Sequence, residues 1–184
     1  MNHTDLAPSA WVKRWAHLIP DGGRVLDLAC GHGRHARYLA ARGHGVLACD
    51  RDADALASLA GIEGIEPLQA DLEGGAAWPF AGTLFAGVVV TNYLYRPSFA
   101  NIAAALIPGG VLIYETFALG NERYGKPSNP EFLLRPGELL DAFGRALVVA
   151  CFEQGQVNRP KPARIQRLCA VRGTHPESDL SSPE

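Results

Sequence analysis

The chain of 184 residues lacks several features that mark particular classes of protein. It has no apolar run that approaches the roughly 20 residues needed to span a bilayer, which argues against a membrane protein. It also has no excess of basic residues, with 17 Lys and Arg against 19 Asp and Glu and a formal net charge of −2. Because a chain that grips a polyanion usually carries such an excess, the composition argues against a nucleic-acid substrate.

Cysteine is scarce, and its four positions form no C-x-x-C metal or redox pattern. They are Cys30, Cys49, Cys151 and Cys169. Three of them lie in apolar, strand-like runs, so we expect reduced cysteines inside a cytoplasmic protein and no metal site. The N-terminus has neither the basic region nor the apolar block of a secretory signal, which also favours a cytoplasmic location.

What the chain does have is a regular alternation of strand-like and helical segments. Apolar residues at helical spacing predict a first helix over residues 9–19. Short apolar runs then predict strands at 25–28, 46–49, 65–69, 85–90 and 111–114. Helices are expected between them, from the glycine turn to Gly43, at 53–60 and at 97–106. This order indicates βαβ units, and therefore a parallel, doubly wound, Rossmann-like α/β sheet.

The C-terminal part follows a different pattern. A short helix at 137–143 precedes strands at 146–152 and 164–172, and only a loop rich in Gly and Pro separates these two strands. That loop is too short for a crossover helix, so the two strands should pair antiparallel as a hairpin. The fold class is then a mostly parallel sheet of seven strands with an antiparallel C-terminal strand.

We expect one domain over residues 1–172 and a disordered tail over 173–184, which is polar and lacks an apolar pattern. The N-terminal helix, within residues 1–20, carries Trp11 and Trp15. Two interpretations of it stay open, a lid that closes over the site and simple packing against the sheet.

A glycine-rich turn joins the first strand to the following helix. Gly31-His-Gly33-Arg-His-Ala36 satisfies the G-x-G-x-x-A pattern, in which a ligand approaches backbone amides at a helix N-terminus. Asp50 ends the second strand, 19 positions after Gly31, where a carboxylate can accept both hydroxyls of a ribose. These features indicate a nucleotide cofactor, but they fit a nicotinamide dinucleotide and S-adenosylmethionine (SAM) equally well.

Two further carboxylates favour SAM. Asp27 lies in the first strand, where it would repel a pyrophosphate, whereas SAM has no phosphate and carries a cationic sulfonium and ammonium. We expect it to contact that ammonium directly or through water. Asp71 follows the third strand, where it can accept from the adenine amine while the backbone N–H of Leu72 donates to a ring nitrogen. Each carboxylate alone has a bland explanation as a cap or turn residue, but three at successive strand ends indicate a site.

The segment Val25-Leu-Asp-Leu-Ala-Cys-Gly-His-Gly-Arg34 resembles the first motif of class I SAM-dependent methyltransferases. Asp50, Gln69-Ala70-Asp71 and Pro108-Gly-Gly-Val-Leu112 resemble the later motifs in the same order. Ala29 stands where the family usually has glycine, which stiffens the turn. The segment Gly-Arg34-His35, followed by Tyr38-Leu39, is most similar to the compact tellurite-resistance-type and related small-molecule branch.

The resemblance implies a methyltransferase that uses SAM and releases S-adenosylhomocysteine (SAH). The residues expected to bind the cofactor are Asp27, Ala29, Cys30, Gly31, Gly33, Arg34, His35, Asp50, Arg51, Asp71, Leu72, Thr91, Asn92 and Tyr93. No catalytic residue is named, because methyl transfer from a sulfonium is an in-line displacement that positioning and desolvation can drive.

The methyl acceptor should lie beside the ends of the fourth and fifth strands. The candidate contacts are Tyr95, Asn121, Tyr124 and Lys126. Ordinary packing of the tyrosine and an exposed loop are the competing explanations, and ordering of residues 117–135 on substrate binding stays open. The segment from Thr91 to Arg96 is not of the Asn-Pro-Pro-Tyr type used to methylate amino groups of bases or Gln, which argues against that chemistry.

Five basic residues lie in and beside the C-terminal hairpin. We expect them to form a solvent-exposed face of that hairpin, and contact with a phosphate group is the alternative. The five residues are Arg159, Lys161, Arg164, Arg167 and Arg172. Taken together, the residues predict a cytoplasmic SAM-dependent methyltransferase, monomeric or homodimeric, with a small-molecule acceptor. The alternatives are a non-catalytic SAM-binding or regulatory module and an NAD-dependent oxidoreductase.

Overall fold

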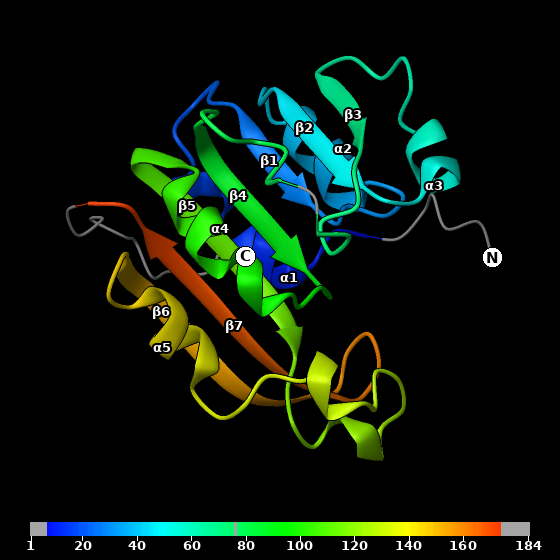
Figure 1. Cartoon of the computed structure of the whole chain (residues 1–184), viewed down its shortest axis with the longest axis vertical. Helices are drawn as coiled ribbons and strands as arrows, with labels where there is room; N and C mark the ends of the chain where they lie inside the picture. Colours follow the sequence, from blue (N-terminus) through cyan, green and yellow to red (C-terminus); the bar gives the residue numbers. More distant parts are fainter. Residues whose placement is uncertain (1–6, 76, 174–184) are drawn as a thin grey trace.

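The structure, a computed structural model, describes residues 7–75 and 77–173. Within these ranges one sheet of seven strands has the order β3-β2-β1-β4-β5-β7-β6 (Figure 1). The strands are β1 (Val25–Leu28), β2 (Val46–Asp50), β3 (Ile65–Gln69), β4 (Phe85–Thr91), β5 (Leu106–Phe117), β6 (Val148–Val157) and β7 (Ala163–Val171). The first five run parallel, and β7 lies antiparallel to both β5 and β6. The predicted fold class, including the C-terminal hairpin, is confirmed.

Helices cover both faces of the sheet. They are α1 (Ala10–Trp15), α2 (Arg34–Ala40), α3 (Ala53–Ala57), α4 (Phe99–Ala104) and α5 (Glu138–Phe143). Short 3₁₀ turns lie at Ala16–Leu18, Arg96–Ser98, Asn121–Arg123 and Pro130–Phe132. Side chains alternate along each strand, so Leu26 and Leu28 join the core beneath α4 and α5, whereas Val25 joins the core beneath α1 and α2. None of the helices in the described ranges has the length and apolar character needed to cross a bilayer.

The N-terminal helix is part of the core rather than an appendage. Trp11 and Trp15 are each 1% exposed. The indole N–H of Trp11 donates to the carbonyl oxygen of Leu168 in β7 at 3.3 Å. The helix therefore packs against the sheet, and the residue before it, Ser9, reaches the ligand edge, while a role as a lid stays a prediction. The expected tail at 173–184 lies outside the described residues except for Gly173.

Strand β5 is longer than predicted, because it begins at Leu106 and runs through Pro108-Gly-Gly. Glycine makes this passage possible. Gly109 has φ +78°, and a Cβ on Gly110 would lie only 3.0 Å from the carbonyl oxygen of Phe85. At its other end β5 reaches Phe117. The hairpin strands extend beyond the predicted bounds at their turn, to Val157 and from Ala163, and are shorter than predicted at their opposite ends. The sheet therefore protrudes further at its ligand edge than the sequence indicated.

Candidate functional site

The carboxyl ends of the parallel strands meet at one edge of the sheet, where ligands of open α/β sheets bind. Two cavities adjoin there. The first, of about 240 Å³, lies between the ends of β2 and β3 and we call it the Asp71 cavity. The second, of about 290 Å³, lies over the loop between β1 and α2 and we call it the glycine-turn cavity. Both are lined by Ala29, Asp50 and Asn92, so the two form one continuous cleft.

Most residues predicted to bind the cofactor line this cleft. Arg51, Asp71, Leu72 and Tyr93 border the Asp71 cavity. Cys30, Gly31, Arg34 and Thr91 border the glycine-turn cavity. The structure therefore brings together side chains from four strand ends that lie up to 64 positions apart in the chain, from Ala29 to Tyr93.

Asp50 sits at the junction of the two cavities and is held by two backbone groups. Its Oδ2 accepts from the N–H of Gly31 at 2.7 Å, and its Oδ1 accepts from the N–H of Asp52 at 3.0 Å. The carboxylate is therefore fixed against the glycine turn, with its remaining lone pairs available to a ligand. A negative charge at this amide opposes binding of a second anion at the same place.

Asp27 has a different position from the one expected. Its side chain is 1% exposed and its Oδ2 accepts from the N–H of Ala36 in α2 at 2.9 Å. Burial raises the pKa of this carboxyl to about 7. Asp27 does not line either cavity of the cleft. In this structure it holds the first turn of α2 against β1, and its contact with a cofactor stays a prediction.

His35 and Gly33 also act on the local structure of α2. The His35 Nε2 accepts from the N–H of Ser9 at 3.1 Å, so Nδ1 carries the hydrogen that points to Thr91 Oγ1 at 3.3 Å. Burial, with the charge of Arg34, lowers the pKa of His35 to about 3, which keeps the ring neutral. A Cβ on Gly33 would lie 2.5 Å from Leu59, so this glycine permits close packing of the turn on the segment that follows α3.

Tyr93 presents a buried hydroxyl to the Asp71 cavity. It makes no hydrogen bond of good geometry with the described residues, although the carboxylate of Glu73 lies close enough to interact with it. Burial and the negative charge of nearby Glu73 raise its pKa above the usual value. Tyr93 and Glu73 both line the Asp71 cavity, so this hydroxyl and carboxylate are polar groups that a ligand there would meet.

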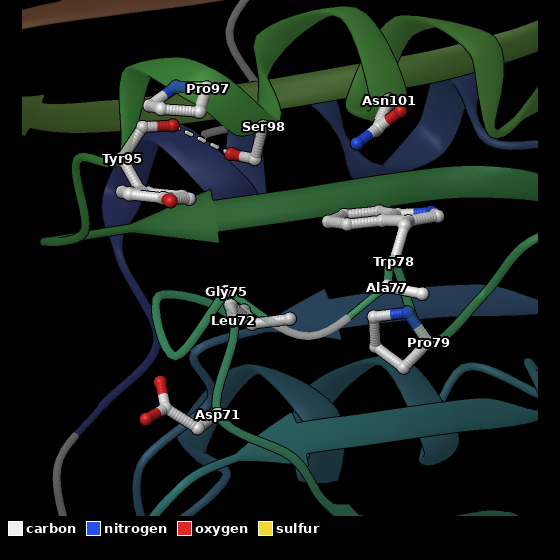
Figure 2. A pocket seen from close by; sticks show the side chains of 10 residues that line it. All are labelled: Asp71, Leu72, Gly75, Ala77, Trp78, Pro79, Tyr95, Pro97, Ser98 and Asn101. Atoms are coloured by element: carbon white, nitrogen blue, oxygen red, sulfur yellow. Dashed lines mark hydrogen bonds between the residues drawn. The ribbon is translucent and has the colours of Figure 1, made fainter.

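A smaller cavity, of about 140 Å³, lies behind Asp71 and Leu72. In Figure 2 the rings of Tyr95 and Trp78 flank it, with Asp71 at the lower left and Asn101 above the ring of Trp78. Tyr95, a predicted acceptor contact, is therefore placed on the Asp71 side of the cleft. Trp78 was not among the predicted residues, because a tryptophan in a loop gives no signal of what it faces.

The other predicted acceptor contacts lie in the loop after β5. Asn121 is 2% exposed, and its amide accepts from the N–H of Arg164 and donates to the carbonyl oxygen of Pro127. Tyr124 donates to Gln156 Oε1 at 2.8 Å, and Lys126 is exposed. Asn121 thus fastens the loop to β7, and contact of these three residues with an acceptor stays a prediction.

A further cavity, of about 340 Å³, opens beside the β6–β7 hairpin, and we call it the hairpin cavity. It is lined by Arg34 and Asn92, which it shares with the glycine-turn cavity. Its other polar lining residues are Ser9, Glu115, Arg159, Lys161 and Arg167. Sequence reasoning assigned the basic residues to a solvated face and did not single out Glu115. The signal available in the sequence was that Glu115 directly follows the predicted strand at 111–114, at the ligand edge of the sheet.

Comparison with known proteins agrees with this arrangement. A family model described as a methyltransferase domain matches residues 25–110. Among solved structures the chain is similar to TehB from Haemophilus influenzae, with TM-score 0.73 and 19% identity over 94% of this chain and 64% of that chain. The chain thus spans less than two thirds of the TehB chain. No curated protein sequence matches it significantly.

Two other solved structures are similar over most of both chains. A TehB-like SAM-dependent methyltransferase from Corynebacterium glutamicum has TM-score 0.66 and 21% identity, over 91% of this chain and 89% of that one. The N-methyltransferase NodS from Bradyrhizobium japonicum has TM-score 0.67 and 16% identity, over 88% and 94%. At these identities the likeness shows the fold.

The sheet order and the cleft define a Rossmann-like α/β protein with the topology of a methyltransferase. With the family match over residues 25–110, they indicate that the chain carries a class I SAM-dependent methyltransferase domain. The family implies use of SAM. Among the described residues, no cluster of His, Cys, Asp or Glu has the arrangement of a metal site.

Proposed function

We propose that the chain binds SAM in the cleft and transfers its methyl group to a small-molecule acceptor. The observation that carries this proposal is the continuous cleft with Asp50 at its centre. Asp50 is suited to the ribose hydroxyls, and Asp71 with the N–H of Leu72 is suited to the adenine in the Asp71 cavity. Arg34, which borders the glycine-turn cavity, offers a cation for the methionine carboxylate.

The same geometry disfavours a nicotinamide dinucleotide. In dinucleotide sites the glycine-turn amides face the pyrophosphate. Here the N–H of Gly31 is occupied by the Asp50 carboxylate at 2.7 Å, so a phosphate would meet a negative charge. SAM brings no phosphate to this turn.

When bound, SAM supplies an electrophilic methyl carbon that takes up the acceptor's lone pair while the C–S electron pair returns to sulfur, which yields SAH. The protein's contribution is to hold both partners in line and to exclude water. His35 serves this purpose indirectly, because both ring nitrogens are engaged and the neutral ring braces Thr91 at the cleft. No general acid is required, since the leaving group departs as a neutral thioether, whereas an acceptor that carries a proton on its nucleophilic atom must also release that proton.

The test is transfer of a labelled methyl group from SAM across a panel of small-molecule acceptors. We expect labelled product with at least one acceptor class, together with SAH in equal amount. SAM binding without transfer to any acceptor would favour the alternative, a non-catalytic SAM-binding module. The hairpin cavity, which shares two lining residues with the cleft, favours the enzyme.

A further inference from the structure

We propose that the hairpin cavity is the acceptor site and that it takes a small organic carboxylate with an apolar body. This inference rests on the proposed function for the placement of SAM. It concerns a part of the molecule, the β6–β7 hairpin, that lies outside the residues matched by the methyltransferase-domain model.

The position of the cavity is the first argument. Arg34 and Asn92 line both the hairpin cavity and the glycine-turn cavity. The two cavities therefore adjoin at these two residues, so a ligand in one would lie beside a ligand in the other. The volume of about 340 Å³ lies within the range of about 300–1,000 Å³ typical of small-molecule sites.

The walls of the cavity are apolar. They are formed at the protruding ends of the last strands by Phe117, Val157, Ala163 and Ile165. Phe117 pairs with Ile165, and Val157 pairs with Ala163, so these side chains come from adjacent positions in the sheet. This surface suits an aromatic or aliphatic body rather than a bare inorganic ion.

The charge of the cavity is unevenly distributed. Arg167 is neutralised, because it lies 3.6 Å from Glu115 and 3.4 Å from Glu153 and also stacks over the ring of Trp11. Arg159 and Lys161, in the turn between β6 and β7, form no hydrogen bond or ion pair with any described residue, although both line the cavity. Two cations without an acidic partner at the tip of the hairpin favour an anionic group there.

The register of the sheet separates the Glu115 end of the cavity from the end at the hairpin turn. Glu115 pairs with Arg167, whereas Ala163, which pairs with Val157 beside the turn, lies four residues earlier in β7. Glu115 is fixed by the Ser9 hydroxyl at 2.7 Å, and its backbone oxygen accepts from the N–H of Asn92. An acceptor therefore points its carboxylate to Arg159 and Lys161, and its nucleophilic end to Glu115 and Asn92 beside the cofactor.

Ligand-observed saturation-transfer NMR tests this inference, because it detects weak binding. The probes are benzoate, phenylacetate and hexanoate, each beside its uncharged amide, with inorganic phosphate as the bare anion. Each is measured on the full chain with and without SAH. We expect the carboxylates to bind more tightly than the amides and than phosphate, and raised salt to weaken them.

The variant R159Q/K161Q should lose the preference for carboxylate over amide and weaken carboxylate binding about threefold to tenfold, as expected for two partly exposed cations. The single variant R145Q removes an exposed arginine outside the cavity. It should change neither the affinity for carboxylates nor their preference over amides. Equal binding of acid and amide, equal binding of phosphate, no binding at all, or an unaffected double variant would overturn the inference. Failure of SAH to bind would instead count against the proposed function, while the carboxylate preference is still measured on the chain alone.

Discussion

Ala29 and Asn92 follow the neighbouring strands β1 and β4, and both have a left-handed backbone, with φ of 54° and 55°. Both also line the two cavities of the cleft. Asparagine tolerates this conformation, whereas alanine does so only at a cost of about 1–2 kcal/mol. The residue that replaces the family's usual glycine therefore stores strain at the cofactor turn.

The substitution A29G should release that strain. After allowing for the greater freedom of glycine in the unfolded chain, we expect a gain of about 0.5–1 kcal/mol in the free energy of unfolding. The matched control is A41G, because Ala41 is exposed and has right-handed φ of −62°. There glycine should destabilise by a similar amount. Urea unfolding measures both, and equal destabilisation by the two variants would contradict the assignment of strain to Ala29.

Asp27 and His35 should give opposite contributions to the dependence of stability on pH. Burial raises the pKa of Asp27 from 3.8 to about 7, so between these values the folded chain binds more protons and stability falls as pH rises. Burial lowers the pKa of His35 from 6.5 to about 3, so in that window the unfolded chain binds more protons and stability rises with pH. From about pH 4 to 6.5 the two contributions offset each other.

Replacing one of these two residues should make the contribution of the other to the pH dependence of stability measurable. In D27N, which keeps an acceptor for the N–H of Ala36, the free energy of unfolding should climb from pH 4 to 6.5 with an added slope of up to about 1.4 kcal/mol per pH unit. In H35Q the change in slope should have the opposite sign. Urea titrations at several pH values measure the differences, and curves of both variants that run parallel to the wild type would refute the assignment.

Glu138 ties the start of α5 to the loop after β4. It accepts from Arg96 Nε at 2.5 Å, from Arg96 Nη2 at 3.0 Å and from the N–H of Arg135 at 2.7 Å. Arg96 also donates to the carbonyl oxygens of Glu131 and Leu133, so this cluster holds the segment that returns from the β5 loop.

We expect E138Q to lower the free energy of unfolding by about 1–3 kcal/mol at pH 7, because Arg96 loses a charged partner. Burial raises the pKa of Glu138, but the hydrogen bonds from Arg96 and Arg135 outweigh it, so the net pKa lies below 4.5. The difference between wild type and variant should therefore shrink as pH falls below 4.5. The control is E63Q, at an exposed position, and an E138Q effect no larger than the control's would show that the cluster is not stabilising.

The sheet and most of the residues that line the cleft were predictable, because apolar periodicity and strand-end carboxylates are local signals. Asp50 and Asp71 lie at the ends of the second and third strands, as the order of strands in the sequence predicted. The position of Asp27 was not predictable in the same way, since burial against α2 depends on how the helix packs. Asn121 illustrates the same limit, because a polar residue in a long loop proved to be a buried fastening to β7. The hairpin cavity required strand lengths and register that no local pattern contains.

The central claim is that the cleft around Asp50 binds SAM and its product. Calorimetry with SAH, SAM and NAD on the wild type and on D50N tests it most directly, with D54N as the control for loss of a nearby exposed carboxylate. We predict that the wild type binds SAH and SAM stoichiometrically and does not bind NAD. In D50N the affinity for SAH and SAM should fall about tenfold to a hundredfold, as expected for the loss of one charge-assisted hydrogen bond, and in D54N it should not change. Binding of NAD without SAM or SAH, or unchanged affinity in D50N, would contradict the account.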